Sequence, residues 1–191
     1  MDKPASILSA ALKLFVQYGF HGTPTSRIAS EAGVSNGTLF HYFKTKDELV
    51  VALYNHIKEE LNTHLQVKIN EGKGFKEKFR NMFVYSLRWA VAHQDEYYFL
   101  QQFHFSPHLS LISVEEIAKQ THLHAQLLEE AIQANIFKNL PADLIASLAG
   151  SQINGMYQYL MASSLPAEEQ NKTIGESFEL IWSMIANPAI I

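Results

Sequence analysis

The chain has 191 residues, of which 47% are hydrophobic, and its formal net charge at pH 7 is −4. This length and apolar content allow one large or two small domains with a buried core, and the lack of cysteine excludes a disulfide framework, a thiolate metal site and a cysteine nucleophile. No run of 18 apolar residues occurs, and Lys13 interrupts the apolar N-terminal stretch, so we expect no membrane span, no signal peptide and a cytoplasmic location.

The first two predicted helices are short. Apolar residues at helical spacing favour a helix over residues 5–18, which Gly19 ends. Thr23 can then cap a second helix that has proline at its first position. In the opening turn of this helix Thr25 is a candidate phosphate contact and Arg27 a weaker one, although hydroxyls in a first turn often satisfy only local amides.

The clearest functional signal is the stretch AGVSNGTLFHYFKTKDEL, residues 32–49. Gly33 supplies a left-handed residue that ends the second helix, and Ser35 can cap a third helix over residues 36–43. Two helices joined by a tight turn are therefore predicted.

The third helix has two different faces. At 100° per residue Leu39 and Phe43 share the inward face. A side chain that reads the major groove needs donors or acceptors near base edges, and small neighbours let the helix backbone come close. The outward face is small and polar, so we predict that it reads DNA. Its residues, with those on the flanks, are Asn36, Gly37, Thr38, Phe40, His41 and Tyr42.

A capping box, Thr45 with Glu48, opens a fourth helix that extends to about residue 70. Lys46 is unusual there, because a cation in the first turn opposes the helix macrodipole at a cost of about 0.3–1 kcal/mol. Its position is explained if the helix end and the ammonium together receive an anion, most simply a DNA phosphate. The alternative is that Lys46 points into water and the neighbouring acids compensate for it.

Further helices are predicted after residue 70, and no segment with strand periodicity or internal repeat was found. The chain is therefore predicted to be all-α. The predicted spans are residues 75–93, 95–105, 113–135, 141–162 and 166–186.

This order of helices, with GVSNGTLFHYFKTKDEL across the turn, resembles the N-terminal DNA-binding domain of TetR-family transcriptional regulators. The resemblance covers about residues 5–55, and residues 56–191 match only in helical pattern. It implies a three-helix helix-turn-helix domain over residues 1–46. It also implies a C-terminal helical domain over residues 47–191, linked by helix 47–70, that binds a small effector and forms a homodimer through its last two helices.

Carried over by position, the resemblance makes Thr25, Ser26 and Lys46 contacts to the DNA backbone. Phe40 stands where the family most often has Tyr, and Ser26 where Arg is frequent. We therefore expect electrostatic attraction to contribute little to the affinity for DNA. The first 56 residues indeed carry five basic and four acidic side chains. The candidate DNA-binding residues are Thr25, Ser26, Arg27, Ser35, Asn36, Gly37, Thr38, Phe40, His41, Tyr42 and Lys46.

Aromatic residues between positions 79 and 105 are more numerous than a small helical core needs. They can line an apolar pocket with a few polar anchors, which an apolar or aromatic effector would suit, although each single ring can equally serve core packing. The candidate pocket residues are Phe83, Trp89, Tyr98, Gln102, Phe103, His124 and Tyr157.

The last two helices would leave much apolar surface exposed in a monomer, and pairing with a symmetry mate would bury it in a four-helix bundle. A dimer also supplies a second recognition helix about 34–36 Å away along the DNA. The candidate interface residues are Ile145, Gln152, Met156, Tyr159, Phe178, Ile181, Trp182 and Ile185.

No nucleophile elbow or Gly-rich phosphate loop occurs, so we predict no enzyme, no catalytic residue, no cofactor and no metal. The leading interpretation is a homodimeric, ligand-responsive repressor that binds a pseudo-palindromic operator in double-stranded DNA. One alternative is a small-molecule binding protein with a non-functional helix-turn-helix. A more distant one is a metal-dependent enzyme that uses His104 with His108, since His122 and His124 would point about 200° apart on a helix.

Overall fold

The computed structural model describes residues 2–190, and these fall into two compact units. Unit 1 contains the residues up to Glu60 together with His93–Ile117, and unit 2 contains Leu61–Ala92 with the residues from Ala118 onward. Met1 and Ile191, the outer limits of the two predicted domains, lie outside the described residues. The boundary after residue 46 stays a prediction.

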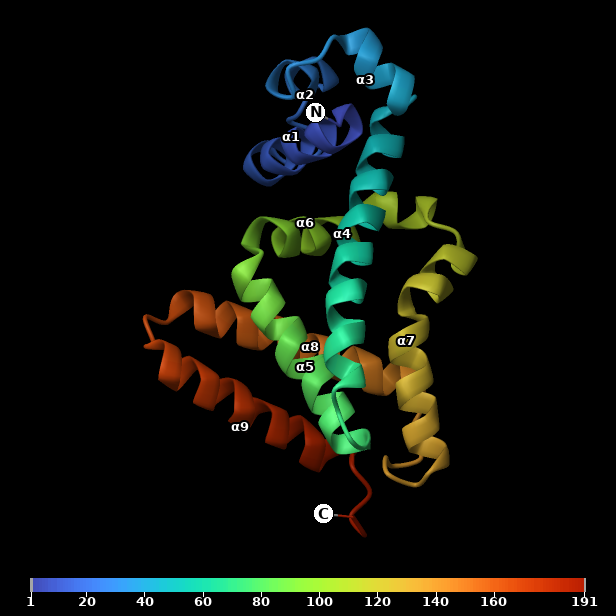
Figure 1. Ribbon diagram of the computed structural model, residues 1–191, viewed down its shortest axis with the longest axis vertical. Coiled ribbons are helices and arrows are strands. Elements are labelled where there is room, and N and C mark those ends of the chain that lie inside the picture. Colours follow the sequence, from blue (N-terminus) through green and yellow to red (C-terminus); the bar gives the residue numbers. More distant parts are fainter. Residues whose placement is uncertain (1, 191) are drawn as a thin grey trace. The chain divides into compact units, whose positions relative to one another are not determined.

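The predicted all-α fold is confirmed, because the described residues form helices and an isolated bridge between Phe137 and Ala186 (Figure 1). None of these helices combines the length and the apolar character that crossing a membrane requires. The elements are α1 (Lys3–Tyr18), α2 (Thr25–Glu31), α3 (Asn36–Tyr42), α4 (Lys46–Asn70), α5 (Phe75–Ala92), α6 (Gln94–His104), the 3-10 helix η1 (Pro107–Leu111), α7 (Val114–Gln133), α8 (Ala142–Ala162) and α9 (Ala167–Ile185).

In unit 1 α1 packs against α2 and α6, and α2 packs against α3. Aromatic rings hold this arrangement together. The Phe15 ring lies 5.3 Å from that of Phe20 and 6.2 Å from that of Phe99, and all three side chains are buried. The short α3 is thus carried by helices that have a core of their own.

The turn between α1 and α2 corrects one prediction. Thr23 does not cap α2, since α2 starts at Thr25 with Pro24 in the cap position. The Thr23 hydroxyl is instead buried and lies 3.1 Å from the carbonyl of Leu14 and 2.8 Å from that of Gly19. By bonding to α1 and to the residue that follows it, Thr23 holds the turn against the end of α1.

In unit 2 α5 packs against α8 and α9, and these two form a helical hairpin (Figure 1). Their shared core is aromatic. Phe178 of α9 is fully buried, with its ring 6.1 Å from that of Phe79 and 6.2 Å from that of Phe83 on α5. The buried apolar faces of these helices therefore pack against one another within one chain.

Candidate nucleic-acid interface

The turn before α3 is built as the sequence predicted. Gly33 has φ of 66°, in the left-handed region that glycine enters without a steric cost. Ser35 has an extended backbone, and its Oγ accepts a hydrogen bond of 3.1 Å from the backbone N–H of Thr38. This cap fixes where α3 begins, at Asn36.

The outward face of α3 is exposed except at Thr38. Leu39 is fully buried, whereas Thr38 is half-buried with its hydroxyl 3.0 Å from Ser35 Oγ. Phe40 and Tyr42 keep 40% and 42% of their surface exposed. The other exposed residues of the helix are Asn36, Gly37 and His41.

Glycine at position 37 is not required by the fold of unit 1. A Cβ added there would meet Ser35 Oγ at an unstrained 3.7 Å. Glycine inside a helix nevertheless costs about 1 kcal/mol relative to alanine. A surface that must come close to another molecule would explain this residue.

The first turn of α2 presents further polar groups. Thr25 is half-buried and Ser26 is exposed. The Arg27 guanidinium lies 4.0 Å from the centre of the Tyr18 ring and donates a hydrogen bond of 2.8 Å to the Tyr18 hydroxyl. Tyr18 thus limits the positions that the Arg27 charge can take.

Lys46 makes an interaction that the sequence did not predict. Its ammonium donates a hydrogen bond to the backbone carbonyl of Phe20, and partial burial lowers the pKa of Lys46 while the nearby Asp47 raises it. Lys46 therefore does not simply point into water. An ammonium has three donors, so two N–H bonds remain for an anion.

The capping box at the start of α4 forms only in part. Thr45 Oγ1 accepts a hydrogen bond of 3.0 Å from the Glu48 N–H, as predicted. The Glu48 carboxylate accepts a bond of 2.8 Å from the N–H of Lys44 rather than from that of Thr45. It thereby fixes the short connection between α3 and α4.

Known proteins resemble the chain most strongly over these N-terminal helices. A family model for bacterial regulatory proteins of the tetR family matches residues 7–53. Over 77 residues, or 40% of its length, the chain is 42% identical to the HTH-type transcriptional regulator RutR of Escherichia coli K12. A crystal structure from Shewanella sp. PV-4, assigned to the tetR family of transcription regulators, superposes with a TM-score of 0.88 at 28% identity, covering 97% of this chain and 99% of that one. The N-terminal helices of the chain belong to the TetR family of transcription regulators.

The similarity is uneven along the chain. It spans only about a third of RutR, since the matched segment is 33% of that protein. The structure of FadR from Bacillus subtilis in complex with stearoyl-CoA superposes with a TM-score of 0.78 at 21% identity, covering 94% of this chain and 97% of FadR. At that identity the likeness shows a shared fold alone.

The predicted effector-pocket residues fall in both units. Two cavities in unit 2, one beside Trp182 and one beside Leu180, are lined by none of them. Phe83 is fully buried near Phe178, and Phe103 is fully buried and stacked on Tyr54, so core packing accounts for both rings. Unit 1 holds Tyr98, which is about half exposed, with Gln102 and Phe103, and unit 2 holds Phe83, Trp89, His124 and Tyr157.

The predicted dimer interface is corrected at five positions. These side chains expose at most 5% of their surface in a single chain, because they form the core of unit 2, and a partner could bury no more of them. Tyr159 is 52% exposed, whereas Met156 and Gln152 are half-buried, and Gln152 donates to the Ser177 carbonyl at 2.6 Å. The corrected residues are Ile145, Phe178, Ile181, Trp182 and Ile185.

Apart from Tyr159, the sequence did not predict which apolar residues α8 and α9 expose. A second apolar stripe on these helices could have indicated them. It is shorter than the first stripe and is interrupted by polar residues. These exposed residues are Leu144, Met161, Leu180 and Met184.

The metal-binding histidine pair is not formed. α6 ends at His104, as expected from Pro107, so His108 lies in the separate helix η1. His108 Nε2 lies 3.2 Å from a carboxylate oxygen of Asp47, and its ring packs against that of Phe20 at 5.0 Å. Within residues 2–190 no group of three or more His, Asp or Glu side chains is arranged to hold a metal ion.

Proposed function

We propose that the chain is a homodimeric, ligand-responsive repressor that binds a pseudo-palindromic DNA operator through α3 and releases it when a small apolar or aromatic effector binds. The observation that carries this proposal is the exposed, small and polar face of α3, held by the Ser35 cap and the buried Leu39 in N-terminal helices of the TetR family. A helix presented in this way suits the major groove, where base edges can be read.

In this proposal the contacts fall into two kinds. Gly37 lets the helix backbone approach the groove, while Thr38 and His41 reach the base edges. Contacts to phosphates position the domain without reading sequence. The proposed phosphate contacts are Thr25, Ser26, Arg27, Lys46 and, through first-turn backbone groups, Ser35 and Asn36.

The first prediction concerns recognition of DNA. In a mobility-shift assay on DNA upstream of the chain's own gene, we expect binding that survives excess competitor DNA at moderate salt. Thr38→Ala and His41→Ala should change the preference for the contacted base pair by about 1–3 kcal/mol. Lys46→Ala should weaken binding to all DNA sequences alike, and the slope of log affinity against log salt concentration should become shallower by about one.

Two controls accompany this assay. Lys172→Ala, an exposed lysine on α9, should leave DNA binding unchanged. Lys46 also donates a hydrogen bond to the Phe20 carbonyl, so its loss could affect stability. A thermal unfolding curve must therefore show that the Lys46→Ala variant is folded at the temperature of the assay. Ligand binding without any specific retardation would favour the alternative, a binding protein with a non-functional helix-turn-helix.

The proposed dimer uses the outer face of α8 and α9. It comprises the exposed residues Leu144 and Tyr159 of α8 with Leu180 and Met184 of α9. Apolar side chains gathered on two adjacent helices are expected to pair with the same face of a second copy, because such a contact is self-complementary about a two-fold axis.

The second prediction tests this face. Leu180 is 68% exposed, so Leu180→Asp should leave the fold intact but place a charge in the interface. Burying an unpaired carboxylate is strongly unfavourable, and we expect a mainly monomeric variant at concentrations where the unaltered chain is dimeric. Light scattering after size-exclusion chromatography measures this. Leu111→Asp, at a 54% exposed site on η1, is the matched control, and equal masses for both variants would contradict the proposed interface.

The effector is proposed to be apolar with at least one hydrogen-bond donor. Asn62 donates a hydrogen bond of 2.8 Å to the Gln120 carbonyl, but its own buried Oδ1 accepts none from the described residues. In unit 1 the buried Oε1 of Gln102 likewise accepts none. A buried acceptor left without a donor costs about 1–3 kcal/mol of stability. A ligand that donates a hydrogen bond to it would recover this free energy. FadR, which shares the fold, was solved with stearoyl-CoA, a ligand with a long apolar part.

A further inference from the structure

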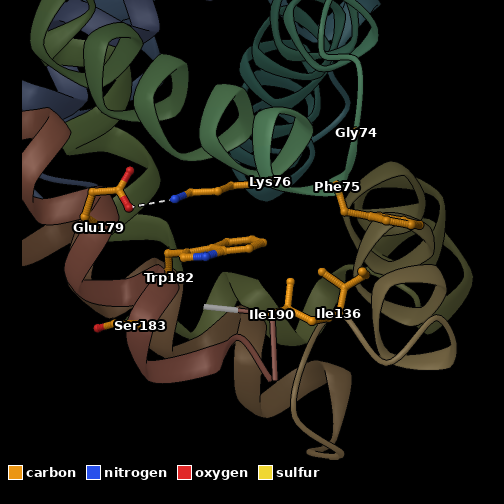
Figure 2. A pocket seen from close by; sticks show the side chains of 8 residues that line it. All are labelled: Gly74, Phe75, Lys76, Ile136, Glu179, Trp182, Ser183 and Ile190. Carbon is orange, nitrogen blue, oxygen red and sulfur yellow. Dashed lines mark hydrogen bonds and ion pairs between the residues drawn. The ribbon is translucent and has the colours of Figure 1, made fainter. Parts of the chain in front are cut away.

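Unit 2 contains a cavity of about 390 Å³ that none of the proposed contacts uses. Its volume lies within the usual range for small-molecule sites. Figure 2 shows an opening between the start of α5, the turn after α7, the second half of α9 and the C-terminal segment. The residues that line it are Gly74, Phe75, Lys76, Ile136, Glu179, Trp182, Ser183 and Ile190.

The walls of this cavity are apolar and held in place. Trp182 exposes only 5% of its surface, and its ring packs against that of Phe137 at 5.7 Å and that of Phe178 at 6.1 Å. Ile136 is fixed by its backbone, because its carbonyl accepts a hydrogen bond of 2.8 Å from the N–H of Asn187. The lining residues that keep apolar surface exposed are Phe75, Ile136 and Ile190, so a ligand ring would meet an aromatic and aliphatic surface that Trp182 supports from behind.

Charged groups lie at one edge of the cavity. The Lys76 side chain passes over the Trp182 ring, with its ammonium 5.4 Å from the ring centre and 2.9 Å from Glu179 Oε2 (Figure 2). Both side chains of this ion pair are about half exposed, at 49% and 57%. Exposed ion pairs contribute only about 0–1 kcal/mol, so Lys76 can exchange Glu179 for another anion at little cost.

We propose that this cavity binds a small amphipathic organic anion, such as an aryl carboxylate or aryl sulfonate, with its ring against Phe75, Ile136 and Ile190 and its acid group on Lys76. The first turn of α5 adds to the attraction, since the N–H groups there lack intrahelical partners and the N-terminal end of a helix favours negative charge. This site goes beyond the proposed function and does not depend on DNA binding.

The test uses two fluorescent probes that share an aromatic body. 1-Anilinonaphthalene-8-sulfonate carries a negative charge, and N-phenyl-1-naphthylamine carries none. Lys76→Gln should weaken binding of the sulfonate roughly threefold to tenfold, because it removes the cation. Glu179→Gln should strengthen it by roughly twofold to fivefold, because Lys76 loses its competing partner. Both variants should leave the affinity of the neutral probe unchanged.

A closely matched control exists in the same unit. Lys68 pairs with Glu71 at 2.9 Å and lies 5.2 Å from the centre of the Tyr85 ring, but it does not line the cavity beside Trp182. Lys68→Gln should leave the binding of both probes unchanged. Ile190→Asp, at a 46% exposed position of the lining, should weaken both probes without unfolding the chain.

Opposite shifts for the two members of the Lys76–Glu179 pair, seen with the charged probe alone, would support the site. Equal sulfonate affinities for the unaltered chain and both variants would overturn it, as would an Ile190→Asp variant that binds both probes normally. Because these titrations contain no DNA, failure of operator binding and failure of this site are distinguishable.

Discussion

Leu39→Ala is expected to destabilise the N-terminal helices by about 2–5 kcal/mol, the usual cost of truncating a buried leucine. Leu39 is the buried residue of α3, a helix of only seven residues. Isolated helices shorter than about 12–15 residues are marginal in water, so α3 depends on this anchor and on its caps. We expect the variant to lose DNA binding together with this stability, measured by denaturant unfolding and by the mobility-shift assay.

Phe40→Ala is the matched comparison, one residue further along the same helix. Its ring is 40% exposed, so we expect a loss of stability below about 1 kcal/mol. A loss as large as that of Leu39→Ala would show that the two faces of α3 are assigned the wrong way round.

Phe178→Ala is expected to be the most destabilising single change in unit 2, at about 3–5 kcal/mol. Phe178 is fully buried, and its ring lies near those of Phe79, Phe83 and Trp182. Removing the ring would leave a new cavity in the centre of the core shared by α5 and α9. Urea unfolding monitored by circular dichroism measures the change.

This variant also separates the core of α9 from its proposed interface. Phe178→Ala should lower the free energy of unfolding at every protein concentration. Leu180→Asp, two residues further, should act mainly through the association of two copies. A stable Phe178→Ala variant that merely fails to dimerise would restore the interface predicted from the sequence.

The local features of the fold were predictable because their causes are local. Gly19 and Gly33 have the positive φ angles that end a helix, and Ser35 caps α3. Each of these depends on residues within four positions of one another. The same is true of the two faces of α3, since a helical repeat of 3.6 residues fixes which side chains share a side.

Side chains that reach across the fold were predicted less well. The Thr23 hydroxyl bonds to α1 rather than capping α2, and the Lys46 ammonium bonds to a carbonyl 26 positions earlier in the chain. Neither partner can be identified from spacing, because a flexible or rotatable polar group takes whichever acceptor the packing brings near.

The sequence by itself determined that this chain is all-α, where its helices begin and end within a few residues, and which polar face the short third helix turns outward. Only the tertiary structure decided which of two apolar stripes on α9 packs inside. Helical periodicity shows that a stripe is apolar but not what covers it. The stripe containing Phe178 and Trp182 is covered within one chain, and that containing Leu180 and Met184 is left exposed, because the position of α5 and α8 against α9 is set by the whole core.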